Sequence, residues 1–247
     1  MSKKFSDKNV LITGGSRGIG AAIVKYFAKQ GANVAFTFRH KISDAENTVQ
    51  EAQNFGTNIL AIQADSADAS EVSNAVEQTA KAFGSIDILV NNAGIGLFTP
   101  LQATSINELD QLLAINVRGV VITIQSALKH MPAGGRIINI GSCNAERMPF
   151  PNGGLYAMSK SALVGLVKGL SRELGPRQIT INNIQPGPTD TELNPANGEY
   201  APVMRSLMAI DRFAEVSEIA AFVGFVASEE AGFITGASLK IDGGFTA

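Results

Sequence analysis

The sequence is poor in residues that cross-link chains or bind metals. It contains one cysteine, Cys143, so no disulfide can form within the chain, and a reducing compartment fits this composition. Its two histidines, His40 and His130, are distant from each other and from the cysteine. Metal sites need several such ligands at short, regular spacings. We therefore expect no bound metal.

Runs of charge and long apolar runs are also missing. The net charge is −2 at pH 7, with no basic stripe or block of one sign, which argues against nucleic acid or an anionic membrane as a partner. No apolar run reaches the roughly 18 residues of a membrane-spanning helix. The polar stretch 1–9 lacks the apolar region of a signal peptide. We expect a soluble cytoplasmic protein.

Apolar runs of strand length alternate with helical patterns along the whole chain. With 45% hydrophobic residues in 247, the chain can build one sizeable core. Regular alternation of strand and helix predicts a parallel sheet covered by helices on both faces, hence one α/β domain over 1–247. The expected strands are 10–12, 33–38, 58–64, 86–90, 136–141, 180–185 and 237–241. The expected helices are about 21–28, 43–55, 70–83, 106–131, 154–174 and 215–227.

One long segment, 192–212, carries no regular pattern. It is rich in Asn, Pro, Gly and Met. Loops of this length in a compact domain are uncommon, and many of them are functional. The segment is therefore predicted to be a lid over a binding site.

A glycine-rich stretch joins the first strand to the first helix. It reads Thr13-Gly14-Gly15-Ser16-Arg17-Gly18-Ile19-Gly20. Glycines let the backbone approach a ligand closely, and the N-terminus of the following helix offers free N–H groups to a pyrophosphate. The stretch predicts a dinucleotide site. The alternative is a tight turn that binds nothing.

The end of the second expected strand indicates which dinucleotide. An NAD site usually carries an acidic residue there to bond the ribose hydroxyls, whereas this chain has Phe38 followed by Arg39, His40 and Lys41. An arginine attracts a 2′-phosphate that a carboxylate would repel. With Arg17 nearby, this favours NADP(H). Alternatively, Arg39 and Lys41 are solvated loop charges. Asp65, after the third strand, is placed to meet an adenine ring.

The stretch 142–160 is the predicted catalytic centre. Tyr156 and Lys160 are four residues apart in an expected helix, so their side chains project from one face. An ammonium beside a phenol lowers the phenol pKa and makes it usable in proton transfer. Ser142 ends a strand at the sheet edge where ligands bind. The alternative is that the Tyr-x-x-x-Lys spacing arose by chance. Neither histidine falls at the sheet edge beside Ser142, which argues against a Ser-His-Asp hydrolase.

Two further residues have open interpretations. Asn116 lies in the middle of an expected helix, where a buried amide either has a function or is satisfied within the core. Cys143 directly follows the candidate serine and is either a small buried filler or a thiol that faces the pocket. The pocket walls are predicted from 97–98, 146–150 and the lid residues Tyr200, Met204 and Met208.

Taken in order, these motifs resemble the short-chain dehydrogenase/reductase family over nearly the full length. The motifs are Thr13-Gly14-x-x-x-Gly18-x-Gly20, Asn91-Asn92-Ala93-Gly94, Asn116, Ser142, Tyr156-x-x-x-Lys160, Pro186-Gly187 and Asp242-Gly243-Gly244. The resemblance implies a Rossmann-type doubly wound domain, a nicotinamide cofactor and often a homotetramer. It implies the catalytic set Asn116, Ser142, Tyr156 and Lys160. It implies cofactor contacts at Gly14, Ser16, Arg17, Ile19, Arg39, Asp65, Ser66, Asn92, Tyr156, Lys160, Pro186, Gly187, Thr189 and Thr191.

Within the family the chain looks like the 3-oxoacyl-carrier-protein reductase-like branch. Over 141–149, 185–198 and 207–212 it resembles a subgroup of cyclic-di-GMP-binding biofilm dispersal mediators. Two functions follow from these resemblances. The first is an NADPH-dependent reductase of a ketone or aldehyde, with Tyr156 as general acid. The second is a nucleotide-binding regulator on the same fold with little turnover.

Overall fold

Seven parallel strands form one sheet in the order β3-β2-β1-β4-β5-β6-β7 in the computed structural model, which describes residues 3–247. The predicted α/β doubly wound sheet is confirmed. Because β1 pairs with both β2 and β4, the strand order reverses between β1 and β4, which is where such sheets bind ligands. The strands are β1 Asn9–Thr13, β2 Asn33–Phe38, β3 Ile59–Gln63, β4 Ile88–Asn91, β5 Arg136–Ile140, β6 Thr180–Pro186 and β7 Ser238–Ile241.

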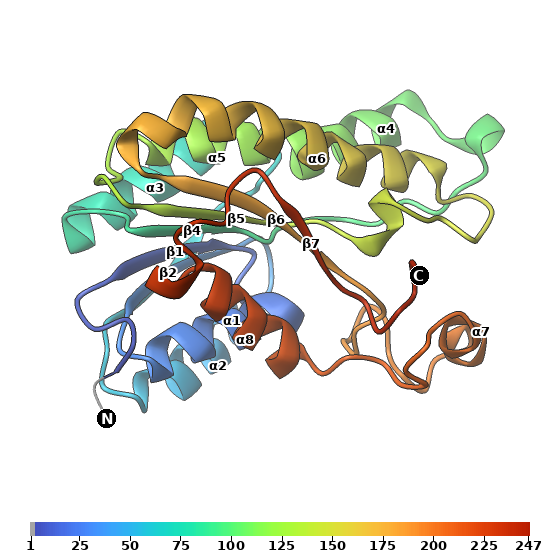
Figure 1. Cartoon of the computed structure of the whole chain (residues 1–247), viewed down its shortest axis with the longest axis horizontal. Coiled ribbons are helices and arrows are strands. Elements are labelled where there is room, and N and C mark those ends of the chain that lie inside the picture. The colour runs from blue at the N-terminus through green and yellow to red at the C-terminus, as the bar shows by residue number, and fades with distance from the viewer. Residues whose placement is uncertain (1–2) are drawn as a thin grey trace.

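Helices cover both faces of this sheet (Figure 1). On one face lie α1 (Gly18–Lys29), α2 (Ile42–Gln53) and α8 (Val216–Val226). The other face carries α3 (Ala69–Phe83), α4 (Ile106–Leu113), α5 (Val120–Ala127) and α6 (Gly154–Leu174). A helix of six residues, α7 (Ala201–Ser206), lies apart from both layers.

Two apolar cores result from this layering, one on each face. Alternate residues of β1 show the division: Val10 and Ile12 belong to the core under α1 and α8, and Leu11 belongs to the core under α5 and α6. All five residues of β1 are buried, as expected for a parallel strand covered on both sides. The cores hold the carboxyl ends of the strands at one edge, where the connecting loops meet.

The expected helix 106–131 is interrupted, which corrects the sequence prediction. α4 ends at Leu113, a π-helical turn spans Ala114–Gly119, and α5 begins at Val120. A side chain at Gly119 would come within 2.4 Å of the Ser66 carbonyl oxygen, so the helix passes very close to the loop after β3. π-Helical turns often mark functional sites. The extra backbone residue leaves the apolar periodicity nearly unchanged, so the pattern did not reveal it.

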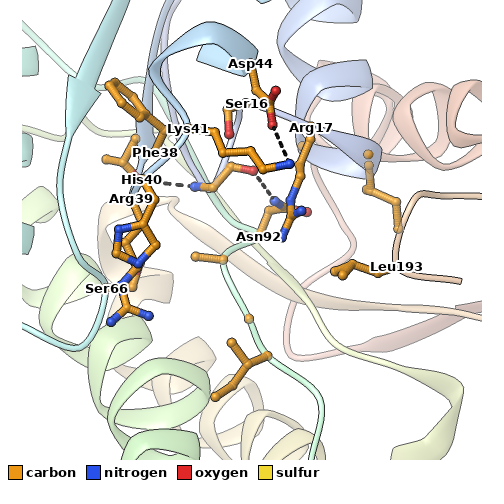
Figure 2. A pocket seen from close by; sticks show the side chains of 18 of the residues that line it. Ser16, Arg17, Phe38, Arg39, His40, Lys41, Asp44, Ser66, Asn92 and Leu193 are labelled. Atoms are coloured by element: carbon orange, nitrogen blue, oxygen red, sulfur yellow. Dashed lines mark hydrogen bonds and ion pairs between the residues drawn. The ribbon is translucent and has the colours of Figure 1, made fainter.

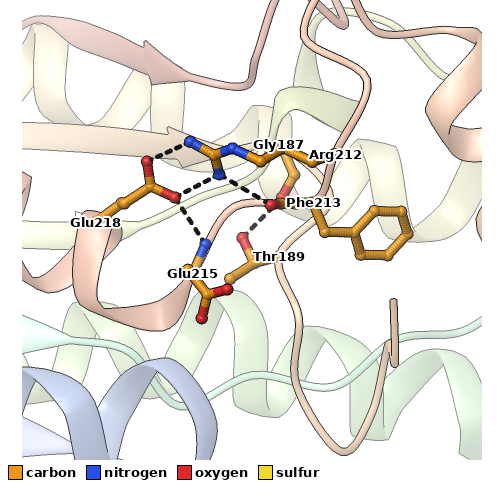
Figure 3. Close-up of polar contacts among 6 residues, drawn as sticks. All are labelled: Gly187, Thr189, Arg212, Phe213, Glu215 and Glu218. Atoms are coloured by element: carbon orange, nitrogen blue, oxygen red, sulfur yellow. Dashed lines mark hydrogen bonds and ion pairs between the residues drawn. The ribbon is translucent and has the colours of Figure 1, made fainter. Parts of the chain in front are cut away.

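The segment 192–212 is closed at its base and is not irregular throughout, since it contains α7. The Asp190 amide donates to the Ala214 carbonyl, and the Ala214 amide donates to the Pro188 carbonyl, both at 2.9 Å. Figure 3 shows Arg212, the last residue of the segment, in a bidentate ion pair with Glu218 of α8 at 2.7 and 2.8 Å. The segment therefore leaves and rejoins the body at one place. Its role as a lid stays a prediction.

No helix within residues 3–247 combines the length and the apolar character needed to cross a bilayer.

Replacing Gly20 with alanine tests the close packing at the first turn. Its β-carbon would lie 2.1 Å from the Gly14 carbonyl oxygen and 2.6 Å from Asn92 Nδ2. We expect Gly20→Ala to lower the free energy of unfolding by about 2 kcal/mol or more, measured by urea denaturation. Gly165→Ala is the control: Gly165 is exposed within α6 with open space around it, and this change should stabilise by up to about 1 kcal/mol. Equal effects of the two variants would contradict this account.

Candidate functional site

A cavity of about 460 Å³ opens at the carboxyl edge of the sheet, beside the point where the strand order reverses. The turn after β1, the loops after β2, β3 and β4, and the start of 192–212 form its walls (Figure 2). Many of the predicted cofactor contacts meet here. Those that line the cavity are Gly14, Ser16, Arg17, Ile19, Arg39, Asp65, Ser66, Asn92 and Thr191.

The glycine turn has the geometry of a cradle. Gly14 adopts φ +68°, a conformation that favours glycine, and the space beside Gly20 has no room for a β-carbon. Asn92 fastens this turn to the loop after β4 by donating to the carbonyls of Thr13 and Gly14 at 3.1 and 2.8 Å. No side chain among residues 3–247 caps the N-terminus of α1. This open helix end, with its close backbone, fits the pyrophosphate of a dinucleotide.

The cations on the rim of the cavity each face a carboxylate of the chain. Arg39 Nε lies 2.8 Å from Asp65 Oδ2. The structure thus pairs two residues that the sequence analysis predicted to contact different parts of the dinucleotide, the 2′-phosphate and the adenine. Arg17 lies 3.7 Å from Glu192, which ties the glycine turn to the start of 192–212.

Figure 2 shows the third pair, Lys41 and Asp44, at 3.9 Å. All three cations are at least 41% exposed, so each pair is worth little and can be exchanged for a ligand phosphate. The sequence analysis did not name the carboxylate partners Asp44 and Glu192 as site residues. Asp44 had a sequence signal, because it stands three residues after Lys41, whereas Glu192 had none.

None of the four candidate catalytic residues, Asn116, Ser142, Tyr156 and Lys160, lines this cavity, but Lys160 approaches it closely. Tyr156 and Lys160 lie on α6, and Lys160 Nζ is 5.9 Å from the centre of the Tyr156 ring. Ser142 is buried at the end of β5, where its Oγ accepts from the Asn144 amide at 3.1 Å. A β-carbon on Gly94 would lie 3.3 Å from Lys160 Nζ, and Gly94 also lines the cavity. One glycine therefore separates the candidate amine from the candidate nucleotide site.

Pro186, Gly187 and Thr189 lie at the end of β6 and beyond, outside the residues that line this cavity. The Thr189 hydroxyl donates to the Gly187 carbonyl at 3.0 Å (Figure 3), and Gly187 packs against Asp242 after β7. They border the segment 192–212, whose first residues reach the cavity wall.

Burial shifts the pKa values of both members of the Tyr-x-x-x-Lys pair. The pKa of Tyr156 is raised by burial, and contact with the Ser142 hydroxyl only partly offsets this. The pKa of Lys160 is lowered to about 8, because the amine is 5% exposed and its charge loses hydration. Lys160 Nζ donates to the Ile140 carbonyl at 2.9 Å instead of to the phenol. The expectation that Lys160 lowers the pKa of Tyr156 is therefore not met here, and the phenol keeps its proton at neutral pH.

The side chain of Asn116 is fully satisfied within the protein. Its Oδ1 accepts from the Ile95 amide at 2.9 Å, and its Nδ2 donates to the Ile95 carbonyl at 2.9 Å and to Ser159 Oγ at 3.0 Å. Of the two interpretations of Asn116, the structure favours the satisfied core amide for its side chain. It connects the π-helical turn, the loop after β4 and helix α6.

Cys143 is buried, and burial together with the nearby Asp242 carboxylate raises the pKa of its thiol to about 12. Such a thiol is inert at neutral pH, so the structure favours the interpretation as a small buried filler. Within residues 3–247, no three His, Cys, Asp or Glu side chains gather in a group that could hold a metal.

Comparison with known proteins agrees with this geometry. A protein family described as Enoyl-(Acyl carrier protein) reductase matches residues 14–246. A solved short-chain dehydrogenase/reductase from Serratia marcescens shares 53% identity and a TM-score of 0.97, covering 99% of this chain and 100% of that one. The chain belongs to the short-chain dehydrogenase/reductase family.

Three other proteins are similar to this chain over nearly their whole length. A short-chain dehydrogenase from Burkholderia cenocepacia, solved in complex with NADP, is 47% identical with a TM-score of 0.97, covering 99% of this chain and 100% of that one. The cyclic-di-GMP-binding biofilm dispersal mediator protein of Escherichia coli is 46% identical over 98% of this chain and 99% of its own length. 3-Oxoacyl-[acyl-carrier-protein] reductase of Staphylococcus aureus is 36% identical over 96% and 97%. The expected resemblance to these branches is confirmed.

The buried amine makes a prediction about stability. Between its folded pKa of about 8 and its ordinary value of 10.5, the unfolded chain holds a proton on Lys160 that the folded chain lacks. Stability therefore rises with pH across this window, by up to about 3 kcal/mol. Urea denaturation from pH 7.5 to 10 should show this gain in wild type relative to Lys160→Met. Parallel curves for the two proteins would contradict it.

Proposed function

We propose that the chain is an NADP(H)-dependent oxidoreductase that reduces the carbonyl of a ketone or aldehyde to an alcohol. The observation that carries this proposal is the meeting of Ser142, Tyr156 and Lys160 near a cavity that the glycine turn lines. Family membership and a relative solved with NADP support it. A homotetramer in the cytoplasm, as the family implies, is part of the proposal.

The residues around the cavity fit NADP(H). Gly14, Ser16 and Ile19, at the open end of α1, would hold the pyrophosphate. Arg39 and Arg17 would bind the 2′-phosphate by exchanging their carboxylate partners. Asp65 and Ser66 would hold the adenine, and Asn92 with Lys160 would hold the nicotinamide ribose. Pro186, Gly187, Thr189 and Thr191 would hold the nicotinamide end.

When bound, NADPH would supply the hydride that a carbonyl carbon accepts. The Ser142 hydroxyl donates a hydrogen bond to the carbonyl oxygen and orients it. Tyr156 gives that oxygen its phenolic proton, which the raised pKa keeps in place until it is needed. The carbon thus gains the hydride, the oxygen gains the proton, and the Lys160 ammonium stabilises the phenolate left behind.

Asn116 completes the set as the residue that holds a water from which Tyr156 and Lys160 recover protons. Its side-chain amide is already bonded to Ile95 and Ser159. A backbone carbonyl of the π-helical turn is therefore the group that we assign to this water.

The walls next to Tyr156 suit an apolar substrate of moderate size. The Phe98 ring lies 5.3 Å from the Tyr156 ring, centre to centre, and is 56% exposed. Leu193 and Tyr200, in the segment 192–212, also expose apolar surface. An exposed apolar ring beside the reacting phenol favours a substrate with an apolar body. The methionines of this segment repack readily, which favours breadth.

Replacing Tyr156 with phenylalanine should remove the proton donor and little else. We expect Tyr156→Phe to lower kcat by about a thousandfold with any accepted ketone. Its Kd for NADPH should stay within about threefold of wild type by fluorescence titration. Wild-type turnover in this variant would show that the assignment is wrong.

Arg39 should decide the choice of nucleotide. We expect Arg39→Gln to raise KM for NADPH by about tenfold or more, because a charged contact is lost and Asp65 is left unpaired beside the phosphate. KM for NADH should not rise. Lys25→Gln is the control, since Lys25 also pairs with a carboxylate, that of Glu51, at 2.8 Å but does not line the cavity. An unchanged ratio of NADPH to NADH use in Arg39→Gln would contradict the assignment.

The name of the Escherichia coli relative supports a second candidate, a regulator that binds cyclic-di-GMP. A pure binding protein has no physical need for Tyr156 beside Lys160. Calorimetric titration with cyclic-di-GMP and with NADPH separates the two functions. No heat with cyclic-di-GMP, together with turnover of a ketone panel, would eliminate the regulator.

A further inference from the structure

The last residues of the chain form a turn with internal support. We call Asp242–Ala247 the C-terminal clasp. The Asp242 carboxylate accepts from the amides of Gly244 and Thr246 at 3.1 Å and from the Thr246 hydroxyl at 2.6 Å. Gly243 and Gly244 adopt φ of +60° and +82°, which turns the chain back on itself. The clasp is thus an ordered element and not a frayed end.

One side of the clasp holds the turn that begins at Ser142. Arg147 Nη1 donates to the Phe245 carbonyl at 2.6 Å, and its guanidinium lies 5.7 Å from the centre of the Phe245 ring. Phe245 is 2% exposed. The Arg147 amide donates to the Cys143 carbonyl at 3.1 Å. A shift of Arg147 would therefore be transmitted to Cys143, the residue next to Ser142.

The other side of the clasp holds the returning arm of 192–212. The Ile210 amide donates to the Gly243 carbonyl at 2.9 Å. A β-carbon on Gly244 would lie 2.6 Å from Ala209 Cβ, and one on Gly243 2.9 Å from Met208 Cε. The two backbones therefore approach as closely as glycine allows. In Figure 1 the chain end turns back from β7 toward the segment that carries α7.

The clasp lies beside two of the predicted substrate walls, which it reaches through Arg147 in 146–150 and through Met208 in 192–212. None of its residues lines the dinucleotide cavity, whose far walls are the glycine turn and the loops after β2 and β3. Its neighbours are the Ser142 turn, the end of β6 at Gly187 and the returning arm. The Arg147–Phe245 contact lies on the Ser142 side of the clasp, whereas Gly187, at the proposed nicotinamide end, packs against Asp242. Loosening that contact therefore acts on the substrate side.

We propose that the C-terminal clasp sets the carbonyl-binding site, with Arg147 and Phe245 as positioning residues. Arg147 bonds the Phe245 carbonyl and stacks on its ring, and Gly243 bonds the returning arm. The two walls of the substrate pocket are thereby held at one separation. This inference rests on the proposed reductase function. Loosening the clasp leaves nucleotide binding intact and weakens capture of the ketone.

The test compares Arg147→Met with Arg177→Met. Arg177 is the matched control because its guanidinium also bonds backbone carbonyls, those of Leu128 and Met131, far from the clasp. We expect Arg147→Met to raise KM for the ketone about tenfold with a smaller change in kcat, and to leave the Kd for NADPH within about twofold. Arg177→Met should leave KM unchanged. Equal KM in the two variants would overturn the proposal.

Two variants at Phe245 separate the ring from the carbonyl contact. Phe245→Leu keeps an apolar side chain of somewhat smaller volume without an aromatic face, and Phe245→Ala leaves a larger cavity. We expect KM for the ketone to rise in the order wild type, Phe245→Leu, Phe245→Ala. A Phe245→Ala protein that folds and keeps the wild-type KM would overturn the proposal.

Hydrogen exchange gives a readout that does not depend on turnover. In Arg147→Met, amide exchange should speed up in 143–150 and in 207–212, while 14–20 and 36–41 stay protected as in wild type. Uniform acceleration, or none in these two segments, would overturn the clasp. If wild type binds NADPH but reduces no ketone, the proposed function fails, and the exchange result still decides whether the clasp holds both walls.

Discussion

The site depends on one buried amine, that of Lys160, which has no carboxylate partner within residues 3–247. Lys160 is held by the Ile140 carbonyl at the end of β5, beside the Tyr156 ring and one glycine away from the nucleotide cavity. Desolvation of its charge costs stability at neutral pH, as its lowered pKa records. The packed sheet and α6 supply the stability that keeps it there.

Polar links between loops turn this single group into a site. Asn92 ties the glycine turn to the loop after β4, and Asn116 ties that loop to α6 through Ile95 and Ser159. These hydrogen bonds are 2.8 to 3.0 Å long and at least partly buried, so they hold the loops around the cavity in place. The rim is held more weakly, by exposed ion pairs such as Arg39–Asp65 that a phosphate can replace. Fixed loops and an exchangeable rim suit a protein that binds and releases a charged cofactor.

The sequence was sufficient for the sheet, the glycine turn and the Tyr156–Lys160 spacing, because these depend on local periodicity and on glycine positions. It did not show the π-helical turn around Asn116, since one extra residue barely disturbs a helical pattern. It also led to the wrong electrostatics for Tyr156, because the effect of burial on a pKa depends on contacts from β5 and the loop after it. The link from Arg147 to Phe245 spans nearly a hundred residues, and no local pattern records it.

The central claim is that the site passes a hydride to a carbonyl carbon while Tyr156 protonates its oxygen. The most direct measurement uses two preparations of NADPH, each deuterated at C4 on one face of the nicotinamide ring. The alcohol that each preparation forms from a ketone is analysed by mass spectrometry. The account predicts alcohol carrying one deuterium on the carbinol carbon from one preparation and none from the other. Protein that binds NADPH but forms no labelled alcohol from either preparation, across a broad panel of ketones and aldehydes, would contradict it.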